Sequence, residues 1–123
     1  MQTSTPALIL FAHGARDARW AEPFRRLQEK LQALHPAPVL LAYLELMQPA
    51  LPEAARQAVQ LGCQALQIVP IFLGQGGHIR QDLPDLIAQL RQTYPTIHIA
   101  CAEAAGEDDA VLEALAQYCM RQC

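Results

Sequence analysis

Largely apolar residues gather in four short runs along this chain, at residues 7–12, 39–44, 65–72 and 96–100. Runs of this length, bounded by turn residues and rich in aliphatic side chains, are typical of strands that are buried on both faces. A segment with a helical pattern follows each run. The sequence therefore predicts four strands that alternate with four helices.

The expected helices differ in how clearly the sequence marks them. Apolar residues from Phe24 to Leu34 recur at helical spacing, and prolines at 49 and 52 suit the opening of a second helix that stops near Gly62. For the third helix we expect Asp82 as the cap and Pro84 in the first turn. Residues 110–120 form the fourth expected helix.

Strands that alternate with helices predict an α/β fold, a three-layer α/β/α sandwich around a four-stranded parallel sheet. Right-handed crossovers restrict the strand order, and 2-1-3-4 is the order we expect. In that order the first and third strands are neighbours, and the chain reverses direction between them. Ligands bind at such a switch point in open α/β sheets.

Three residues with chemically useful side chains follow the first three strands. His13 follows the first, Glu45 the second, and His78 comes after a turn that contains Gly74, Gly76 and Gly77. Imidazole nitrogens with a carboxylate suit cobalt, iron, nickel or zinc, and imidazole accepts protons at cellular pH. Each residue alone is weak evidence, but together they favour a functional site. The glycines let a large flat ligand approach the backbone.

Arginines near the two histidine turns have two possible roles. Arg80 and Arg16 can bind substrate carboxylates with two hydrogen bonds each, or they can be ordinary solvated charges. We favour substrate binding for Arg80 and leave both roles open for Arg16 and Arg19. We expect no part in the chemistry for His98, inside the fourth strand, or for His35, in a proline-rich loop.

Composition excludes several classes of protein. The 123 residues suit one domain, residues 1–123, and 52% of them are hydrophobic. A net charge of −3 argues against nucleic-acid binding. No apolar run approaches the ~20 residues of a membrane span, and the first residues do not resemble a signal peptide, so we expect a cytoplasmic protein without a membrane partner. The four cysteines contain no CxxC pair, so we expect free thiols.

Three segments together resemble the small CbiX-type sirohydrochlorin chelatases, a family with a chelatase or flavodoxin-like fold. They are residues 13–17, 43–45 and 76–84, read as HGARD, YLE and GGHIRQDLP. The resemblance covers nearly the whole chain. It implies a lyase of cobalamin or siroheme biosynthesis that inserts Co²⁺ or Fe²⁺ into sirohydrochlorin without ATP. The chain indeed has no ATP-binding P-loop motif. The metal is then a substrate, and no cofactor is permanently bound.

The resemblance also implies roles for individual residues. His13 and His78 match the metal-binding and proton-accepting histidines of the family, and Glu45 matches a glutamate that related enzymes add to the metal site. Arg80, Arg16, Gly76 and Gly77 are the expected substrate-binding residues. Two departures are Ala15, where serine is more usual, and residues 103–107, which lack the usual proline-leucine-glycine.

Other functions stay open on the sequence alone. The chain could insert nickel into the same macrocycle, or store and deliver metal or tetrapyrrole without turnover. A flavin-binding module is disfavoured because no phosphate-binding loop follows the first strand. The resemblance to one half of larger chelatases, together with the exposed edges of a four-stranded sheet, leads us to expect a homodimer.

Overall fold

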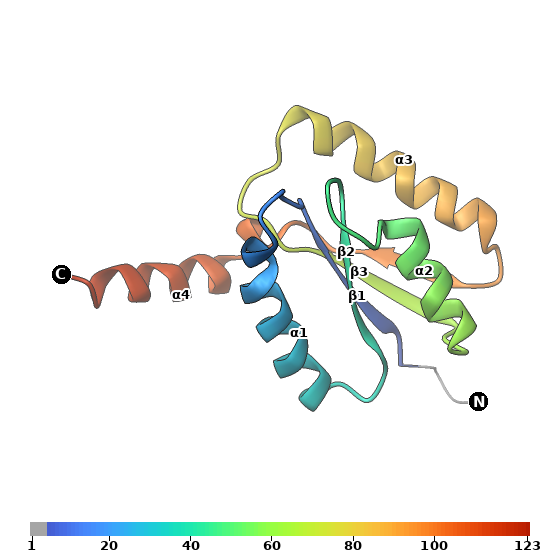
Figure 1. The fold of residues 1–123 in the computed structure, drawn as a ribbon, viewed down its shortest axis with the longest axis horizontal. Helices are drawn as coiled ribbons and strands as arrows, with labels where there is room; N and C mark the ends of the chain where they lie inside the picture. Colours follow the sequence, from blue (N-terminus) through green and yellow to red (C-terminus); the bar gives the residue numbers. More distant parts are fainter. Residues whose placement is uncertain (1–4) are drawn as a thin grey trace.

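The sheet has the parallel arrangement and the strand order that the sequence predicts. The computed structural model describes residues 5–123, with the exception of the His78 side chain. The strands are β1 (Ala7–Ala12), β2 (Val39–Tyr43), β3 (Ala65–Pro70) and β4 (His98–Cys101), in the order β2-β1-β3-β4 (Figure 1). The expected α/β fold is thereby confirmed.

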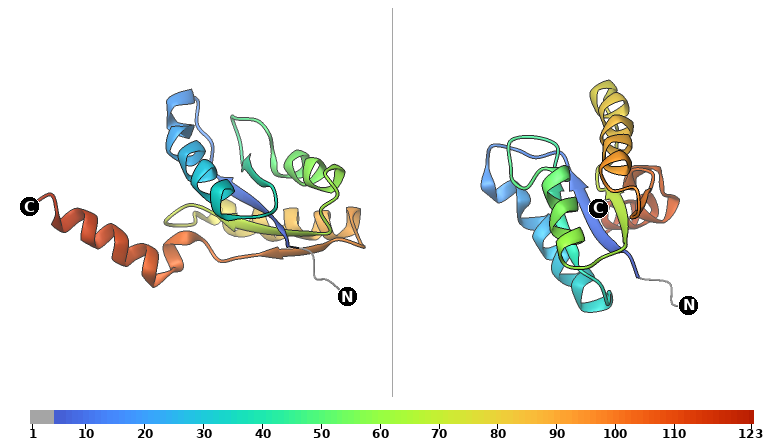
Figure 2. Two further views of the ribbon diagram at one scale, coloured as in Figure 1. Left: turned by 90° about the horizontal axis from the view of Figure 1, so that it is seen from below. Right: turned by 90° about the vertical axis from the view of Figure 1, so that its right-hand side faces the viewer.

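Helices cover both faces of the sheet, but unequally. Helix α1 (Glu22–Leu34), which follows the short 3₁₀ helix η1 (Ala18–Ala21), lies on one face, and α2 (Leu51–Gln60) and α3 (Gly77–Thr93) lie on the other (Figure 2). The last helix, α4 (Asp109–Met120), which follows the 3₁₀ helix η2 (Ala105–Glu107), projects away from the sheet in Figure 1 and in the left view of Figure 2. Within residues 5–123, one face of the sheet is therefore covered by α1 alone.

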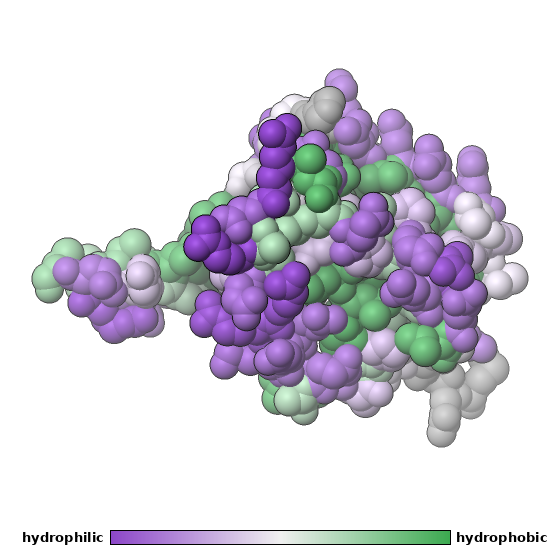
Figure 3. Space-filling view, viewed as in Figure 1, coloured by the Kyte–Doolittle hydropathy of each residue, from purple (hydrophilic) through white to green (hydrophobic). Residues whose placement is uncertain are grey.

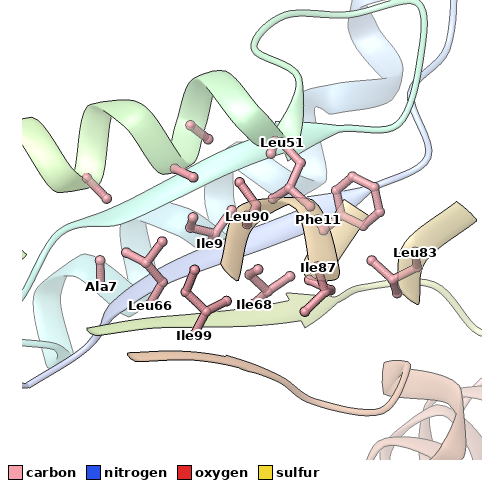
Figure 4. Close-up of a cluster of buried hydrophobic side chains, with 14 of the residues drawn as sticks. Ala7, Ile9, Phe11, Leu51, Leu66, Ile68, Leu83, Ile87, Leu90 and Ile99 are labelled. Carbon is pink, nitrogen blue, oxygen red and sulfur yellow. The ribbon is translucent and has the colours of Figure 1, made fainter. Parts of the chain in front are cut away.

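The larger core lies between the sheet and the α2–α3 layer. Successive side chains of a strand point to opposite faces, so Ile9 and Phe11 enter this core while Leu10 faces α1. Ile68 from β3 and Leu90 from α3 complete its centre (Figure 4). β1 and β3 are the central strands, and this packing fixes the strands that lead to His13 and to the glycine-rich turn.

Helix α3 begins five residues earlier than expected, at Gly77 and not near Asp82. Gly76 is its N-cap residue and adopts an extended conformation, a position where glycine is well tolerated. The spacing of the buried Ile79 and Leu83 continues the apolar stripe into this first turn. Pro84 consequently lies inside the helix. The prediction that Gly77 belongs to the turn was wrong, because Gly77 is the first residue of α3.

Two smaller expectations about the helices and strands also need correction. Leu34 was expected on the buried side of the first helix, yet it is 82% exposed because α1 ends at this residue. Strand β3 ends at Pro70, and Ile71 continues its pairing with β1 by a backbone hydrogen bond to Phe11.

Within the described residues, no helix is long and apolar enough to cross a membrane.

Candidate functional site

The loops that follow β1 and β2 stay paired beyond the ends of the strands. The amide of Leu44 donates a hydrogen bond to the carbonyl of Ala12 (2.9 Å), and the amide of Glu45 donates one to the carbonyl of His13 (3.1 Å). These bonds extend the parallel register of Ala12 with Tyr43. His13 and Glu45 are therefore held side by side at the carboxyl edge of the sheet, where α/β proteins bind ligands.

Gly14 allows this close approach of the two loops. Its φ angle is +98°, in the region that side chains disfavour, and a Cβ atom at this position would lie 1.8 Å from the carbonyl oxygen of Glu45. No other residue type fits there without moving the Glu45 backbone. The glycine that follows His13 is thus a requirement of the site geometry.

The side chains of His13 and Glu45 meet directly. The Nε2 atom of His13 lies 3.0 Å from the Oε1 atom of Glu45, and the two side chains are 50% and 55% exposed. An exposed pair of this kind contributes at most about 1 kcal/mol to stability. Both groups instead remain accessible to a ligand, and together they can coordinate a divalent cation or pass on a proton.

The glycine-rich turn lies on the surface with open space around it. A Cβ atom built on Gly74, Gly76 or Gly77 would meet no other atom within 4 Å. The carbonyl of Gly76 accepts the first hydrogen bond of α3, from the amide of Arg80 (3.1 Å). The turn therefore presents bare backbone at the start of α3, as the prediction of a flat ligand requires.

His78 is the second residue of α3. Its side chain lies outside the described part of the structure, so the expected group of two histidines and a glutamate is described only in part. Among the side chains that are described, no three from histidine, cysteine, aspartate and glutamate lie close enough to hold a metal ion. The described site is the His13–Glu45 pair.

The arginines fall into three different environments. Arg80 is exposed and borders a hollow of about 310 Å³ beside α3 and β4, together with Gln75 and Arg91. Arg16 is exposed in the loop after β1. Arg19 donates hydrogen bonds to Asp17 from its Nε atom (3.3 Å) and its Nη2 atom (3.1 Å), which lowers the pKa of that carboxyl group. Arg19 is thus paired with Asp17, while Arg80 and Arg16 remain candidates for substrate binding.

The remaining histidines lie apart from the site. His98 begins β4 and is exposed, while its neighbour Ile99 is buried, as alternation predicts. His35 is bound through Nε2 to the carbonyl of Pro6 (2.7 Å), at the opposite end of β1 from His13. The expectation that neither takes part in the chemistry stays a prediction.

An aromatic cluster packs close to the loop after β1. The ring of Trp20 lies 4.6 Å from that of Phe24 and 6.4 Å from that of Tyr43, between ring centroids. All three belong to the core on the α1 side. This cluster supports both loops of the His13–Glu45 pair, because η1 follows one loop and Tyr43 precedes the other.

Residues 103–107, whose sequence departs from the resembled pattern, support the third loop. Gly106 packs against the residue that leads from β3 into the glycine-rich turn, since a Cβ atom on it would lie 1.7 Å from the carbonyl oxygen of Leu73. The amide of Gly106 also donates a hydrogen bond to the carbonyl of Phe72 (3.1 Å). Sequence reasoning missed this contact, and its only signal was a glycine in an otherwise unmarked segment.

The fold and the site together define an α/β protein with a histidine–carboxylate site at the carboxyl edge of its sheet. A family model described as CbiX matches residues 7–121, so the chain belongs to the CbiX family. The structure is similar to that of a CbiX protein from Marinobacter aquaeolei VT8, with a TM-score of 0.83, 32% identity and coverage of 94% of this chain and 95% of the other.

Relatives with named activities fall into a short and a long group. The chain is 30% identical over 108 residues to the sirohydrochlorin cobaltochelatase of Sulfolobus acidocaldarius, covering 88% of this chain and 85% of that protein. It is 26% identical over 110 residues to the sirohydrochlorin ferrochelatase of Bacillus subtilis, of which it covers 42%. The cobalt complex of the chelatase SirB from Bacillus subtilis subspecies spizizenii matches with a TM-score of 0.78, 27% identity and coverage of 92% of this chain and 49% of the other.

Proposed function

We propose that this protein inserts a divalent metal ion, Co²⁺ or Fe²⁺, into sirohydrochlorin without ATP. The observation that carries the proposal is the exposed pair of His13 and Glu45, joined at 3.0 Å at the carboxyl edge of the sheet. Membership of the CbiX family supports it, because matched relatives are named as sirohydrochlorin cobaltochelatases and ferrochelatases.

The chemistry of insertion calls for the functional groups that this pair provides. A dication enters the macrocycle and two pyrrole N–H protons leave, so the charge balances without a further reactant. In the proposed mechanism His13, as neutral imidazole, binds the incoming ion and then accepts one pyrrole proton as the ion moves into the ring, and His78 accepts the other. Glu45 holds His13 in position and receives the proton from it, or binds the ion directly.

His78 is the proposed second histidine of the site. Its backbone position, second in α3 and directly after Gly76 and Gly77, supports this role. In the proposal the bare backbone at those two glycines lets the face of the macrocycle approach, and this approach brings the ring nitrogens to the histidines.

The proposed substrate contacts use the positive charges around the site. Sirohydrochlorin carries several carboxylates, and the exposed guanidinium groups of Arg80 and Arg16 can each bind one with two hydrogen bonds. The two arginines lie on different segments, after Gly77 and after Gly14, so they would hold the macrocycle at two points of its edge.

An absorbance assay tests the proposal. Purified protein is mixed with a large excess of sirohydrochlorin and with Co²⁺, Fe²⁺ (anaerobically) or Ni²⁺, each with and without ATP. We expect many turnovers per chain with Co²⁺ or Fe²⁺, unchanged by ATP. A change that stops at one equivalent would show a binding protein, turnover with Ni²⁺ alone would show a nickel chelatase, and no change above the uncatalysed rate would overturn the proposal.

A further inference from the structure

The turn that follows Glu45 has a strained backbone. Leu46 has a φ angle of +65°, and among residues 5–123 it is the only residue other than glycine with a positive φ. The amide of Met47 donates a hydrogen bond to the carbonyl of Glu45 (2.8 Å), which closes a three-residue γ-turn around Leu46. A γ-turn with a positive φ at its centre is rare and strained. Glycine or asparagine would adopt this conformation at lower cost.

Packing on both faces of the sheet holds this turn in place. Leu44, before the turn, packs against the larger core, and Met47, after it, packs against the core on the α1 side. The amide of Tyr43 donates a hydrogen bond to the carbonyl of Pro49 (2.9 Å), which ties the two ends of the loop together. Strained conformations persist where the surrounding structure determines them in this way, and they are concentrated at functional sites.

The residue at the centre of the turn is apolar and exposed. Leu46 is 58% exposed, and it directly follows Glu45, whose carboxylate lies 3.0 Å from His13. In Figure 1 the loop from β2 to α2 rises at the same edge of the sheet as the segments after β1 and before α3. Figure 3 shows apolar surface at this edge beside strongly hydrophilic side chains. An apolar side chain is therefore available to a ligand next to the His13–Glu45 pair.

The stability of the fold does not explain a leucine at this position. A leucine with a positive φ destabilises the turn relative to glycine or asparagine, and its exposed surface gains little from folding. The apolar residues on either side, Leu44 and Met47, are packed against the two cores and supply the stability of the segment. A residue that breaks a local rule inside a well-packed segment is expected at a functional site. Contact with a ligand therefore explains Leu46 better than contact with the rest of the chain.

We propose that Leu46 is a substrate-binding residue, whose exposed side chain packs against the face of the macrocycle. This rests on the proposed function, in which the macrocycle approaches His13 and Glu45. A tetrapyrrole ring is flat and largely apolar, and its acidic groups lie at its edge, so its face calls for an apolar contact that arginines do not provide. In an extended chain successive side chains point to opposite faces, and the turn removes that restriction. Glu45 and Leu46 can then act on one ligand.

The contact affects binding of the macrocycle and not the chemical step. Leu46 has no group that binds an ion or moves a proton, so it makes the same contact before and during metal insertion. Loss of a contact that is equal in the ground state and the transition state raises KM and leaves kcat unchanged. Substitution of Leu46 should therefore differ from Glu45→Gln, which alters the group that binds the ion or receives the proton.

Variants of Leu46 test the proposal, because relief of strain and loss of contact have opposite effects. Leu46→Asn gives a polar side chain that tolerates a positive φ, and Leu46→Gly removes the side chain. We expect each variant to bind metal-free sirohydrochlorin at least ~10-fold more weakly, as measured by fluorescence titration. We also expect each to melt at or above the temperature of the wild type, since the strain is relieved. Leu46→Met keeps an apolar side chain and should bind within about 3-fold of the wild type.

Leu61 provides the matched control. It is 63% exposed and has an ordinary φ angle of −76°, and it lies where α2 ends, before β3 begins at the opposite edge of the sheet. Leu61→Asn should leave the Kd for sirohydrochlorin unchanged. With saturating macrocycle, all of these variants should insert Co²⁺ with a kcat within a few-fold of the wild type, which shows that Glu45 keeps its position.

Two results would overturn the proposal while leaving the proposed function in place. Wild-type affinity in Leu46→Asn or Leu46→Gly would show that the macrocycle does not contact Leu46. A melting temperature below that of the wild type in both variants would assign Leu46 to the fold. Failure of the proposed function is seen separately, as a wild type that binds sirohydrochlorin without inserting metal, and weaker binding by the Leu46 variants would then still support the contact. A wild type that does not bind the macrocycle would overturn both proposals.

Discussion

Gly14 and Glu45 are in such close contact that the backbone of one fixes the backbone of the other. A Cβ atom on Gly14 would lie 1.8 Å from the carbonyl oxygen of Glu45, and the φ angle of Gly14 is +98°. Since His13 precedes Gly14, this contact holds the backbones of His13 and Glu45 close together. The site is thus built into the way the loops after β1 and β2 pack together.

Gly14→Ala should therefore damage both stability and activity. The new methyl group must displace the Glu45 backbone, and the alanine must adopt a left-handed backbone conformation. We expect these two effects to lower the free energy of unfolding by about 1–3 kcal/mol. We also expect metal insertion to slow by at least ~10-fold. Urea unfolding and the absorbance assay measure the two effects. Gly74→Ala is the control for stability, because a Cβ atom at that position meets nothing within 4 Å; equal stability of both variants would contradict the prediction.

Glu45→Gln should separate chemistry from folding. The amide keeps the shape of the side chain but removes the charge that binds the ion or receives the proton, so we expect kcat/KM to fall by roughly 100-fold. The free energy of unfolding should change little, since the pair with His13 is half exposed. Glu53→Gln, which alters an acid–arginine pair on α2, is the matched control. Full activity of Glu45→Gln would remove Glu45 from the proposed site.

The pH dependence should follow the histidines. A free imidazole titrates near pH 6.5, and its protonated form neither binds a metal ion nor accepts a proton. We therefore expect kcat/KM to fall as the pH is lowered from about 8 to 5.5. A profile that is flat over this range would exclude a histidine base.

Two carboxyl groups that are paired with arginines, Asp17 and Glu53, should not contribute to that pH profile. The hydrogen bond from Arg19 lowers the pKa of Asp17, and the hydrogen bond from Arg56 lowers that of Glu53. A carboxyl group with a lowered pKa stabilises the fold above its ordinary titration range, near pH 4, and loses that contribution only at lower pH. These two carboxyl groups should therefore make no change to stability between about pH 5.5 and 8, the range in which activity is expected to fall as the pH is lowered. His35→Ala and His98→Ala should keep the wild-type pH profile of activity.

Gly106→Ala should affect the site from a distance. The added methyl group would lie 1.7 Å from the carbonyl oxygen of Leu73, so the segment from β3 to the glycine-rich turn must shift. We expect metal insertion to slow by at least ~10-fold, and the melting temperature to fall. Glu107→Ala, a change to the neighbouring residue in the same 3₁₀ helix, should have little effect. Wild-type activity in Gly106→Ala would show that this support is not needed.

The sequence was sufficient to predict the sheet because runs of apolar residues indicate buried strands. Residues 7–12 and 65–72 are largely apolar along both faces, and they form the two central strands, β1 and β3. Placing His13 and Glu45 at one edge then required only the rule that parallel strands end at the same edge. Their contact in the structure follows from this order.

Other features depend on contacts that no local pattern reveals. The start of α3 at Gly77 was missed because glycine is unfavourable inside a helix but acceptable at its first positions. The contact between Gly106 and Leu73 was missed because it joins two segments far apart in the sequence.

The most direct test of the proposed site compares the initial rate of Co²⁺ insertion in the wild type, His13→Ala and His78→Ala, with sirohydrochlorin binding measured separately by fluorescence. We expect each variant to bind the macrocycle within a few-fold of wild type and to insert metal at least ~100-fold more slowly. If either variant retains a rate near that of the wild type, the histidine it removes is neither the metal ligand nor the proton acceptor that the proposal requires.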